Sequence, residues 1–185
     1  NGLSKKGHEE ARVAIMTTDT HFKECAVEFS IGGKLCKMGT MCKGSGMIHI
    51  NMGTMLSFVT TDCAISSKML EEALKEAVED SYNMVSVDGD TSTNDTLAIM
   101  ASGKAGNKEI TTKNEDYKTF VAGLTEAFKS LAKQLAKDGE GATKLLICLS
   151  SNHISSRTII TSRTNSTNAI LSSFKRIKPW SYAFR

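Results

Sequence analysis

The chain has 185 residues, a mass of 20.0 kDa and 40% hydrophobic residues, which predicts one domain, or a piece of one, with a hydrophobic core. No stretch approaches the roughly 18 to 20 consecutive apolar residues that cross a bilayer, and residues 1–10 are polar and unlike a signal sequence, so a cytoplasmic protein without membrane contact is expected. The net charge is +3, but six Lys/Arg and no Asp/Glu follow residue 144, which leaves 17 basic and 20 acidic residues in 1–144 and argues against nucleic acid as a partner.

The cysteines are odd in number and form no CxxC pair, so neither a disulfide framework nor a zinc site is expected. We predict that the cysteines are buried thiols without a chemical role. No metal or cofactor is predicted. The residues concerned are Cys25, Cys36, Cys42, Cys63 and Cys148.

Two apolar, β-branched segments near the start, residues 11–17 and 25–31, are predicted strands. Gly32-Gly33 follows the second one and suits a tight two-residue hairpin turn, because glycine accepts the positive φ angles that such a turn requires. The returning strand is expected over residues 35–41.

A glycine-rich loop at residues 43–46 is followed by a predicted strand at 55–60 and by a helix that Ser66 or Ser67 caps. Apolar residues then recur at helical spacing and predict one buried face. They are Leu70, Ala73, Leu74, Ala77 and Val78.

A short strand at 84–87, a polar segment at 88–95 and a strand at 96–101 precede the strongest helical pattern in the chain. Asn114 is its expected cap, acidic residues occupy its first turn, and it is predicted to end at Gly139. This order of elements favours helices layered on a largely antiparallel or mixed sheet. The apolar stripe of the helix comprises Tyr117, Phe120, Val121, Leu124, Phe128, Leu131 and Leu135.

Residues 145–185 differ in character from the rest of the chain. They hold nine Ser, four Thr, the only Pro and the only Trp, and after Ser150 they show no period of two or 3.6. We expect a divergent, basic, Ser/Thr-rich tail, flexible or foreign to the fold, and a shifted reading frame or a misassembled gene end is one hypothesis for it.

The most informative segment runs from Lys43 to Asp62 and places a lysine, a glycine-rich loop and a hydroxyl, Thr54, at the start of an apolar strand. A threonine at a chain terminus carries its own base, an α-amine with a pKa of about 7.7 to 8.0. Gly53, which lacks a Cβ, permits the bent backbone that self-cleavage before Thr54 would need. On these residues alone, a structural threonine at the start of a strand remains the more common explanation.

Other chemistry fits less well. The segment that begins at Asp88 starts like a calcium loop but has Thr93 and Ile99 where such a loop needs Gly and Glu. Gly44-Ser45-Gly46 lacks the spacing of a nucleotide-binding loop. His49 is better explained as a loop or half-buried histidine than as a base.

Several motifs in order make the chain resemble the ornithine acetyltransferase (glutamate N-acetyltransferase) family of arginine biosynthesis. Lys-Gly-Ser-Gly-Met, Asn-Met-Gly-Thr-Met-Leu and Thr-Thr-Asp resemble the segment where these precursors cleave themselves into two chains. Three further motifs, at 14–20, 87–96 and 139–144, match in order and spacing. The resemblance covers residues 11 to about 144.

The resemblance implies cleavage between Gly53 and Thr54, after which Thr54 takes acetyl from N2-acetylornithine as an ester and passes it to L-glutamate. Thr17, Lys43 and Glu140 match substrate-binding positions, where Lys43 would hold a carboxylate and Glu140 an ammonium. It also implies an α/β (α+β-type) fold, an αββα-like sandwich of the self-processing, threonine-nucleophile kind. The partner chains would be the two products of self-cleavage, α and β, in a heterotetramer of two of each.

The chain departs from the family pattern in ways that leave alternatives open. Ile50 replaces the usual Pro, and the upstream Thr-Gly oxyanion element and the C-terminal region are missing, so we expect residues 1–144 to be the central part of the domain, incomplete at both ends. An inactive fragment and a related threonine-nucleophile hydrolase or aminopeptidase are the alternatives. Whether acetyl-CoA serves as a second acetyl donor is also open.

Overall fold

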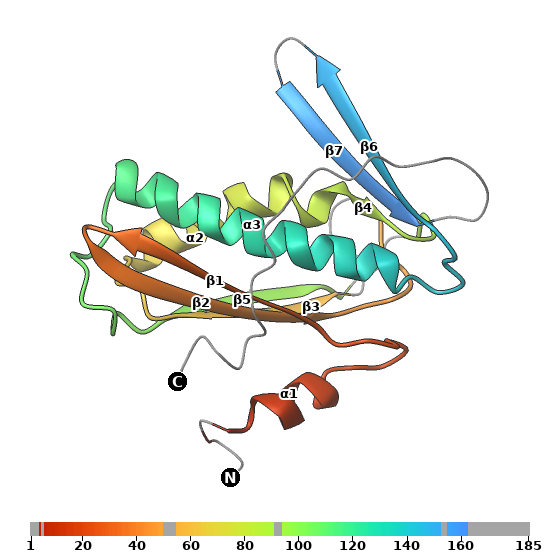
Figure 1. Ribbon diagram of the computed structural model, residues 1–185, viewed down its shortest axis with the longest axis horizontal. Helices are drawn as coiled ribbons and strands as arrows, with labels where there is room; N and C mark the ends of the chain where they lie inside the picture. The colour runs from red at the N-terminus through yellow and green to blue at the C-terminus, as the bar shows by residue number, and fades with distance from the viewer. Residues whose placement is uncertain (1–3, 5, 50–54, 91–93, 153–154, 163–185) are drawn as a thin grey trace.

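The computed structural model describes residues 4, 6–49, 55–90, 94–152 and 155–162, with the backbone alone given for those from 148 onward. These described residues form three helices, a 3-10 turn and seven strands (Figure 1). The elements are α1 (His8–Ala14), β1 (Lys23–Ile31), β2 (Lys34–Lys43), β3 (Leu56–Thr61), α2 (Ser67–Glu79), η1 (Tyr82–Met84), β4 (Val85–Ser86), β5 (Thr96–Ala101), α3 (Glu115–Lys137), β6 (Leu145–Asn152) and β7 (Ser155–Ser162).

The larger sheet has the strand order β1-β2-β3-β5. β1, β2 and β3 pair antiparallel, whereas β3 and β5 pair parallel, so the predicted mixed sheet is confirmed. Gly32 and Gly33 form the predicted hairpin turn, with φ angles of 53° and 76° that a residue with a Cβ rarely adopts.

Helices α2 and α3 cover one face of this sheet (Figure 1). Successive side chains of a strand point to opposite faces, and the alternate residues of β1 that include Phe29 face α3. The Phe29 and Phe120 rings meet edge to face at 5.8 Å, and Gly123 leaves room for Phe29 on the helix surface. The helix faces expected from the sequence pattern are therefore those that pack on the sheet.

The opposite face of the sheet carries apolar residues that are partly or largely exposed. Met41 of β2, Phe58 of β3 and Ala98 of β5 are cross-strand neighbours on it, and Met100 is 58% exposed. Of the described helices, only α1 approaches this face, where Arg12 pairs with Glu24 at 2.9 Å (Figure 1).

The predicted strand at residues 11–17 is wrong, because His8–Ala14 form helix α1. An apolar run of this length does not distinguish a strand from a helix by periodicity. Glu9 and Glu10 in the first turn and Arg12 in the last suit the helix dipole, and Val13 is exposed instead of lying in a sheet.

Two further regions differ from expectation. β2 continues to Lys43, so this lysine ends a strand instead of lying in the loop. Residues 145–152 and 155–162, part of the segment expected to be a flexible or foreign tail, form an antiparallel hairpin whose second strand pairs parallel with β4. In the described part of the chain, the helices are too short or too polar to span a membrane.

Four of the cysteines confirm the expectation of buried thiols. Cys25, Cys36, Cys42 and Cys63 are free and buried, and burial raises the pKa of the Cys25 and Cys36 thiols. The side chain of Cys148 lies outside the described residues.

The cap of α3 provides a test of its local stability. The Asn114 side chain accepts a hydrogen bond from the Tyr117 amide at 3.0 Å, so Asn114→Ala should lower the free energy of unfolding by about 1 kcal/mol. Urea denaturation measures this change. Asn114→Asp retains the acceptor, and a loss of equal size in that variant would contradict the capping role.

Candidate active site at the strand ends

The segment between α1 and β1 is held by the carboxylate of Asp19. This carboxylate accepts hydrogen bonds from the Thr17 amide at 3.2 Å and from the Gly44 amide at 2.7 Å. Asp19 therefore ties the segment that carries Thr17 to the chain directly after Lys43.

Lys43 and Thr17, which the resemblance assigns to substrate binding, are in contact. Lys43 is buried at the end of β2, and its Nζ lies 3.5 Å from the Thr17 hydroxyl, which is on an exposed residue. Lys43 is therefore not a solvated loop lysine, which would be the ordinary explanation of this residue. A buried ammonium next to an accessible hydroxyl is suited to binding an anionic group.

Glu140 reaches the same loop from the far end of the chain. Its amide donates to the Ser45 carbonyl at 2.7 Å, and the residue itself is exposed. A Cβ placed on Gly46 would lie 3.0 Å from Glu140 Oε2, so the carboxylate occupies the space that this glycine leaves free. The loop after Lys43 thus brings a cationic and an anionic side chain into one region.

Gly53 and Thr54, the predicted cleavage site and nucleophile, lie outside the described residues. Their described neighbour Met55 precedes β3, whose first residue, Leu56, pairs with Lys43 on one side and Thr96 on the other. The chain therefore enters β3 beside Lys43, two residues after position 54 in the sequence.

Asp95 is a site residue that the sequence did not single out. Its Oδ1 accepts the Met55 amide at 2.7 Å, and its buried Oδ2 has no hydrogen-bond partner among the described atoms. Burial raises the pKa of this carboxyl, although the Met55 hydrogen bond and the charge of Lys43 act in the other direction. The starts of two adjacent parallel strands, here β3 and β5, lie side by side. Had this pairing been predicted, it would have placed Asp95 next to Met55.

Two other residues have supporting contacts. Asp88 accepts hydrogen bonds from the Met47 and Ile48 amides at 2.6 and 3.2 Å, so its carboxylate anchors the loop. His49 is half-buried and its Nδ1 lies 3.0 Å from the Ser86 hydroxyl, as expected of a structural histidine.

Thr17, Lys43, Asp95 and Glu140 are referred to below as the strand-end site. The fold and this site define a mixed α/β protein in which charged and hydroxyl groups gather near the strand ends of a sheet, where they can form charge-assisted hydrogen bonds to a small charged ligand.

Comparisons with known proteins identify the family. A model described as the ArgJ family matches residues 1–159. The arginine biosynthesis bifunctional protein ArgJ of Symbiobacterium thermophilum is 52% identical over 144 residues, which cover 78% of this chain and 36% of that protein. The protein of the same name from Lactococcus lactis is 49% identical over 150 residues, with coverages of 78% and 38%. The chain belongs to the ArgJ family.

The matches cover only part of each relative. The chain spans little more than a third of the length of these curated relatives. A crystal structure of the arginine biosynthesis bifunctional protein argJ from Bacillus halodurans is similar with a TM-score of 0.46 and 48% identity, over 49% of this chain and 42% of that one. The family match passes residue 144, where the sequence motifs end, and so includes β6 and part of β7.

The close approach of Gly46 and Glu140 yields a prediction. Gly46→Ala should displace the Glu140 carboxylate, because its Cβ would meet that group at 3.0 Å, yet stability should change by less than about 0.5 kcal/mol since the carboxylate is the end of an exposed, flexible side chain. A crystal structure of the variant shows the displacement. An unmoved Glu140 carboxylate would contradict the prediction. Urea denaturation measures the stability change, and Gly46→Ala combined with Glu140→Ala is its control, because the clash is absent there.

Asp95 yields a prediction on pH. Its pKa is raised in the folded protein above the unfolded value of about 3.9, so ionising it costs stability above the folded pKa, and that cost disappears as the pH falls through this value. Asp95→Asn keeps an acceptor for the Met55 amide without the charge. We expect this variant to be at least as stable as the wild type at pH 7, with an advantage that shrinks towards pH 4 in urea denaturation. A variant that is less stable at pH 7 than at pH 4, relative to the wild type, would show that the ionised form is the favoured one.

Proposed function

We propose that this chain carries the central part of a glutamate N-acetyltransferase of the ornithine acetyltransferase type, which acts in arginine biosynthesis through an acetyl-Thr54 intermediate. The contact between Lys43 and Thr17, at the point where the chain enters β3 two residues after Thr54, carries this proposal. The membership of the ArgJ family supports it.

The proposed reaction has three steps. The Thr54 hydroxyl first attacks the Gly53 carbonyl, and the Gly53–Thr54 amide bond breaks, which forms an ester and frees the α-amine of Thr54; water then hydrolyses the ester to a Gly53 carboxylate and the Thr54 hydroxyl. The hydroxyl then attacks the acetyl carbonyl of N2-acetylornithine, with the α-amine taking its proton and passing it to the departing ornithine amine. Finally the amine of L-glutamate attacks the acetyl ester, which releases N-acetylglutamate and restores the hydroxyl.

The strand-end site suits substrates of this kind. The Lys43 ammonium can hold the α-carboxylate that ornithine and glutamate share, with the Thr17 hydroxyl as a second donor. The Glu140 carboxylate, exposed beside Gly46, can pair with the side-chain ammonium of ornithine. No cofactor has a part in this reaction, and acetyl-CoA would enter only as an alternative acetyl donor.

The open apolar face of the sheet supports an αββα sandwich as the architecture of the whole protein. Met41, Phe58 and Met100 would be covered by a second sheet, since large apolar patches on a sheet face are normally buried. The two products of self-cleavage, α and β, would build this sandwich together, and two of each would form the heterotetramer.

Self-cleavage is the first test. Intact-mass measurement of the expressed chain should show two products that begin at Asn1 and Thr54, whereas Thr54→Ala should remain a single 20.0 kDa species. An uncleaved wild-type chain would favour an inactive fragment over the proposed enzyme.

Acetyl transfer is then measured on the cleaved chain with N2-acetylornithine and labelled glutamate. Labelled N-acetylglutamate is the expected product. Release of free acetate without transfer to glutamate would instead identify a threonine-nucleophile hydrolase, which uses the same residue with water as the acceptor.

A further inference from the structure

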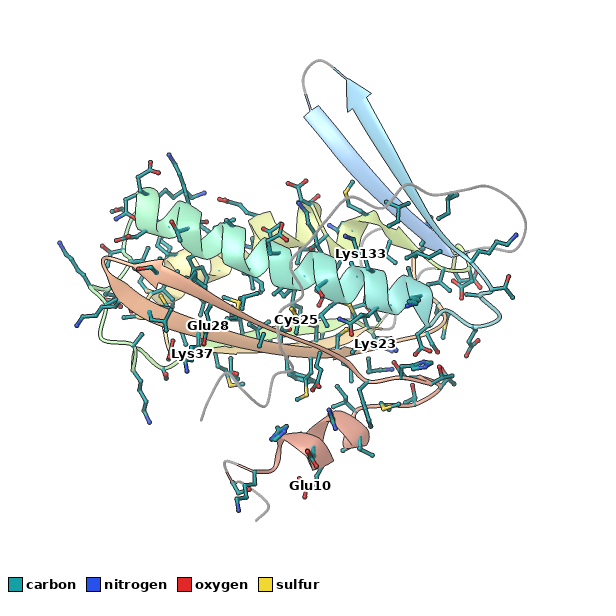
Figure 2. The ribbon with its side chains drawn as sticks, viewed as in Figure 1. Glu10, Lys23, Cys25, Glu28, Lys37 and Lys133 are labelled. Atoms are coloured by element: carbon teal, nitrogen blue, oxygen red, sulfur yellow. The ribbon has the colours of Figure 1, made fainter. Side chains whose placement is uncertain are left out.

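One buried lysine stands between two buried carboxylates at the start of β1. Lys23 Nζ lies 2.6 Å from Asp19 Oδ1 and 2.5 Å from Asp138 Oδ2, and the three side chains are 1%, 0% and 6% exposed. Lys23 lies beneath the C-terminal end of α3, where Asp138 follows the helix (Figure 2). We refer to these three residues as the Lys23 centre.

One side of the Lys23 centre holds the segments of Thr17 and Lys43. Asp19 accepts the Thr17 amide at 3.2 Å and the Gly44 amide at 2.7 Å in addition to the Lys23 ammonium. Both carboxylate oxygens are therefore in use, and the position of each backbone segment depends on where Lys23 holds Asp19.

The other side holds the segment of Glu140. Asp138 accepts the Thr20 amide at 3.0 Å, as well as the Thr20 hydroxyl, and lies two residues before Glu140. The segments also meet directly, because the Thr18 and Ser45 hydroxyls are 2.6 Å apart. Three stretches of chain, far apart in sequence, are thus joined through one ammonium group.

The charges make Lys23 hard to replace. Burial acts to raise the pKa of both carboxyls, but the hydrogen bond from Lys23 and those from neighbouring amides and hydroxyls lower the pKa of Asp19 and Asp138 below the usual value. Both therefore stay ionised and share Lys23. Among the described residues His21 also contacts Asp138, but it is largely exposed and forms no ion pair with Asp19. Without Lys23, two negative charges would face each other out of water.

We propose that Lys23 is a positioning residue of the strand-end site, which sets the mutual placement of Thr17, Lys43 and Glu140 through Asp19 and Asp138. Lys23 itself touches no substrate. The benefit to substrate binding rests on the proposed function, because it assumes that these three residues bind ornithine and glutamate. Displacement of a binding group by about 1 Å can cost on the order of 100-fold in rate or affinity.

Hydrogen exchange at single amides of the full chain tests the positioning without any need for activity. In Lys23→Met, the Thr17, Thr20 and Gly44 amides should lose protection together, while the amides that pair β2 with β3 keep theirs. Lys113→Met is the control, because Lys113 also bridges two carboxylates, those of Glu72 and Glu76, but at the surface. Unchanged exchange at the three amides, or an equal loss across the whole sheet, would overturn the proposal.

A second variant serves if Lys23→Met fails to fold. Asp138→Asn removes one charge and leaves Lys23 paired with Asp19, so the Thr20 amide should lose protection while the Thr17 and Gly44 amides keep theirs. Equal changes in protection at all three amides would show that Asp138 does not hold the Thr20 amide separately from the amides that Asp19 holds, and would also overturn the proposal.

Kinetics of the cleaved chain then test the consequence for substrates. Lys23→Met or Asp138→Asn should raise KM for N2-acetylornithine by about tenfold, with a smaller change in kcat, and should leave cleavage before Thr54 intact. Lys113→Met should have the KM of the wild type.

A wild type that neither cleaves nor transfers acetyl refutes the proposed function, while the exchange measurement still decides the role of Lys23. An unchanged KM in an active variant refutes the role of Lys23 alone.

Discussion

The position of β3 between an antiparallel and a parallel neighbour is the constraint on which the site depends. Leu56 begins β3 and pairs with Lys43 at the end of β2 and with Thr96 at the start of β5. An antiparallel partner brings its end to this edge and a parallel partner brings its start. Lys43 and Asp95 therefore reach the same edge as the chain that follows Thr54, and a sheet with only one type of pairing would separate them.

The strand pairing places these groups at one edge, but backbone pairing alone does not hold the loops that continue from it. The segments around Thr17, Gly44 and Glu140 contain few regular backbone pairs, and carboxylates replace these pairs as acceptors: Asp19 and Asp138 on one side, Asp88 on the other. A carboxylate can accept several N–H groups at once and is well suited to joining loops. The Asp19 and Asp138 side chains are buried, and the Lys23 ammonium balances their charge there.

Local patterns in the sequence predict those elements whose causes are local. Gly32-Gly33 specifies its turn through backbone angles, and Asn114 with the apolar stripe behind it specifies α3. The strand expected at residues 11–17 is wrong because a short apolar run is compatible with both types of structure, and charges at its ends decide for the helix. The joining of Lys23 to Asp138, 115 residues away, depends on how β1 packs under α3. No local pattern reports that packing, and the motifs showed Thr17, Lys43 and Glu140 only through the resemblance.

The two faces of the sheet differ: one packs on the helices, and the other carries Lys43. On the covered face, Cys42 and Ser57 are buried, and the Ser57 hydroxyl has its hydrogen-bond partner, the Tyr82 hydroxyl at 3.0 Å, within the core. Lys43 follows Cys42 and, by the alternation of a strand, belongs to the opposite face, which also carries Met41 and Phe58. The site and the open apolar surface are therefore continuous. A layer that covers Met41 and Phe58 would also exclude water near Lys43 and strengthen its attraction for a carboxylate, because charges interact more strongly in a medium of lower dielectric constant. In the proposed enzyme, such a layer would contribute to binding at Lys43 even where it adds no group that touches the substrate.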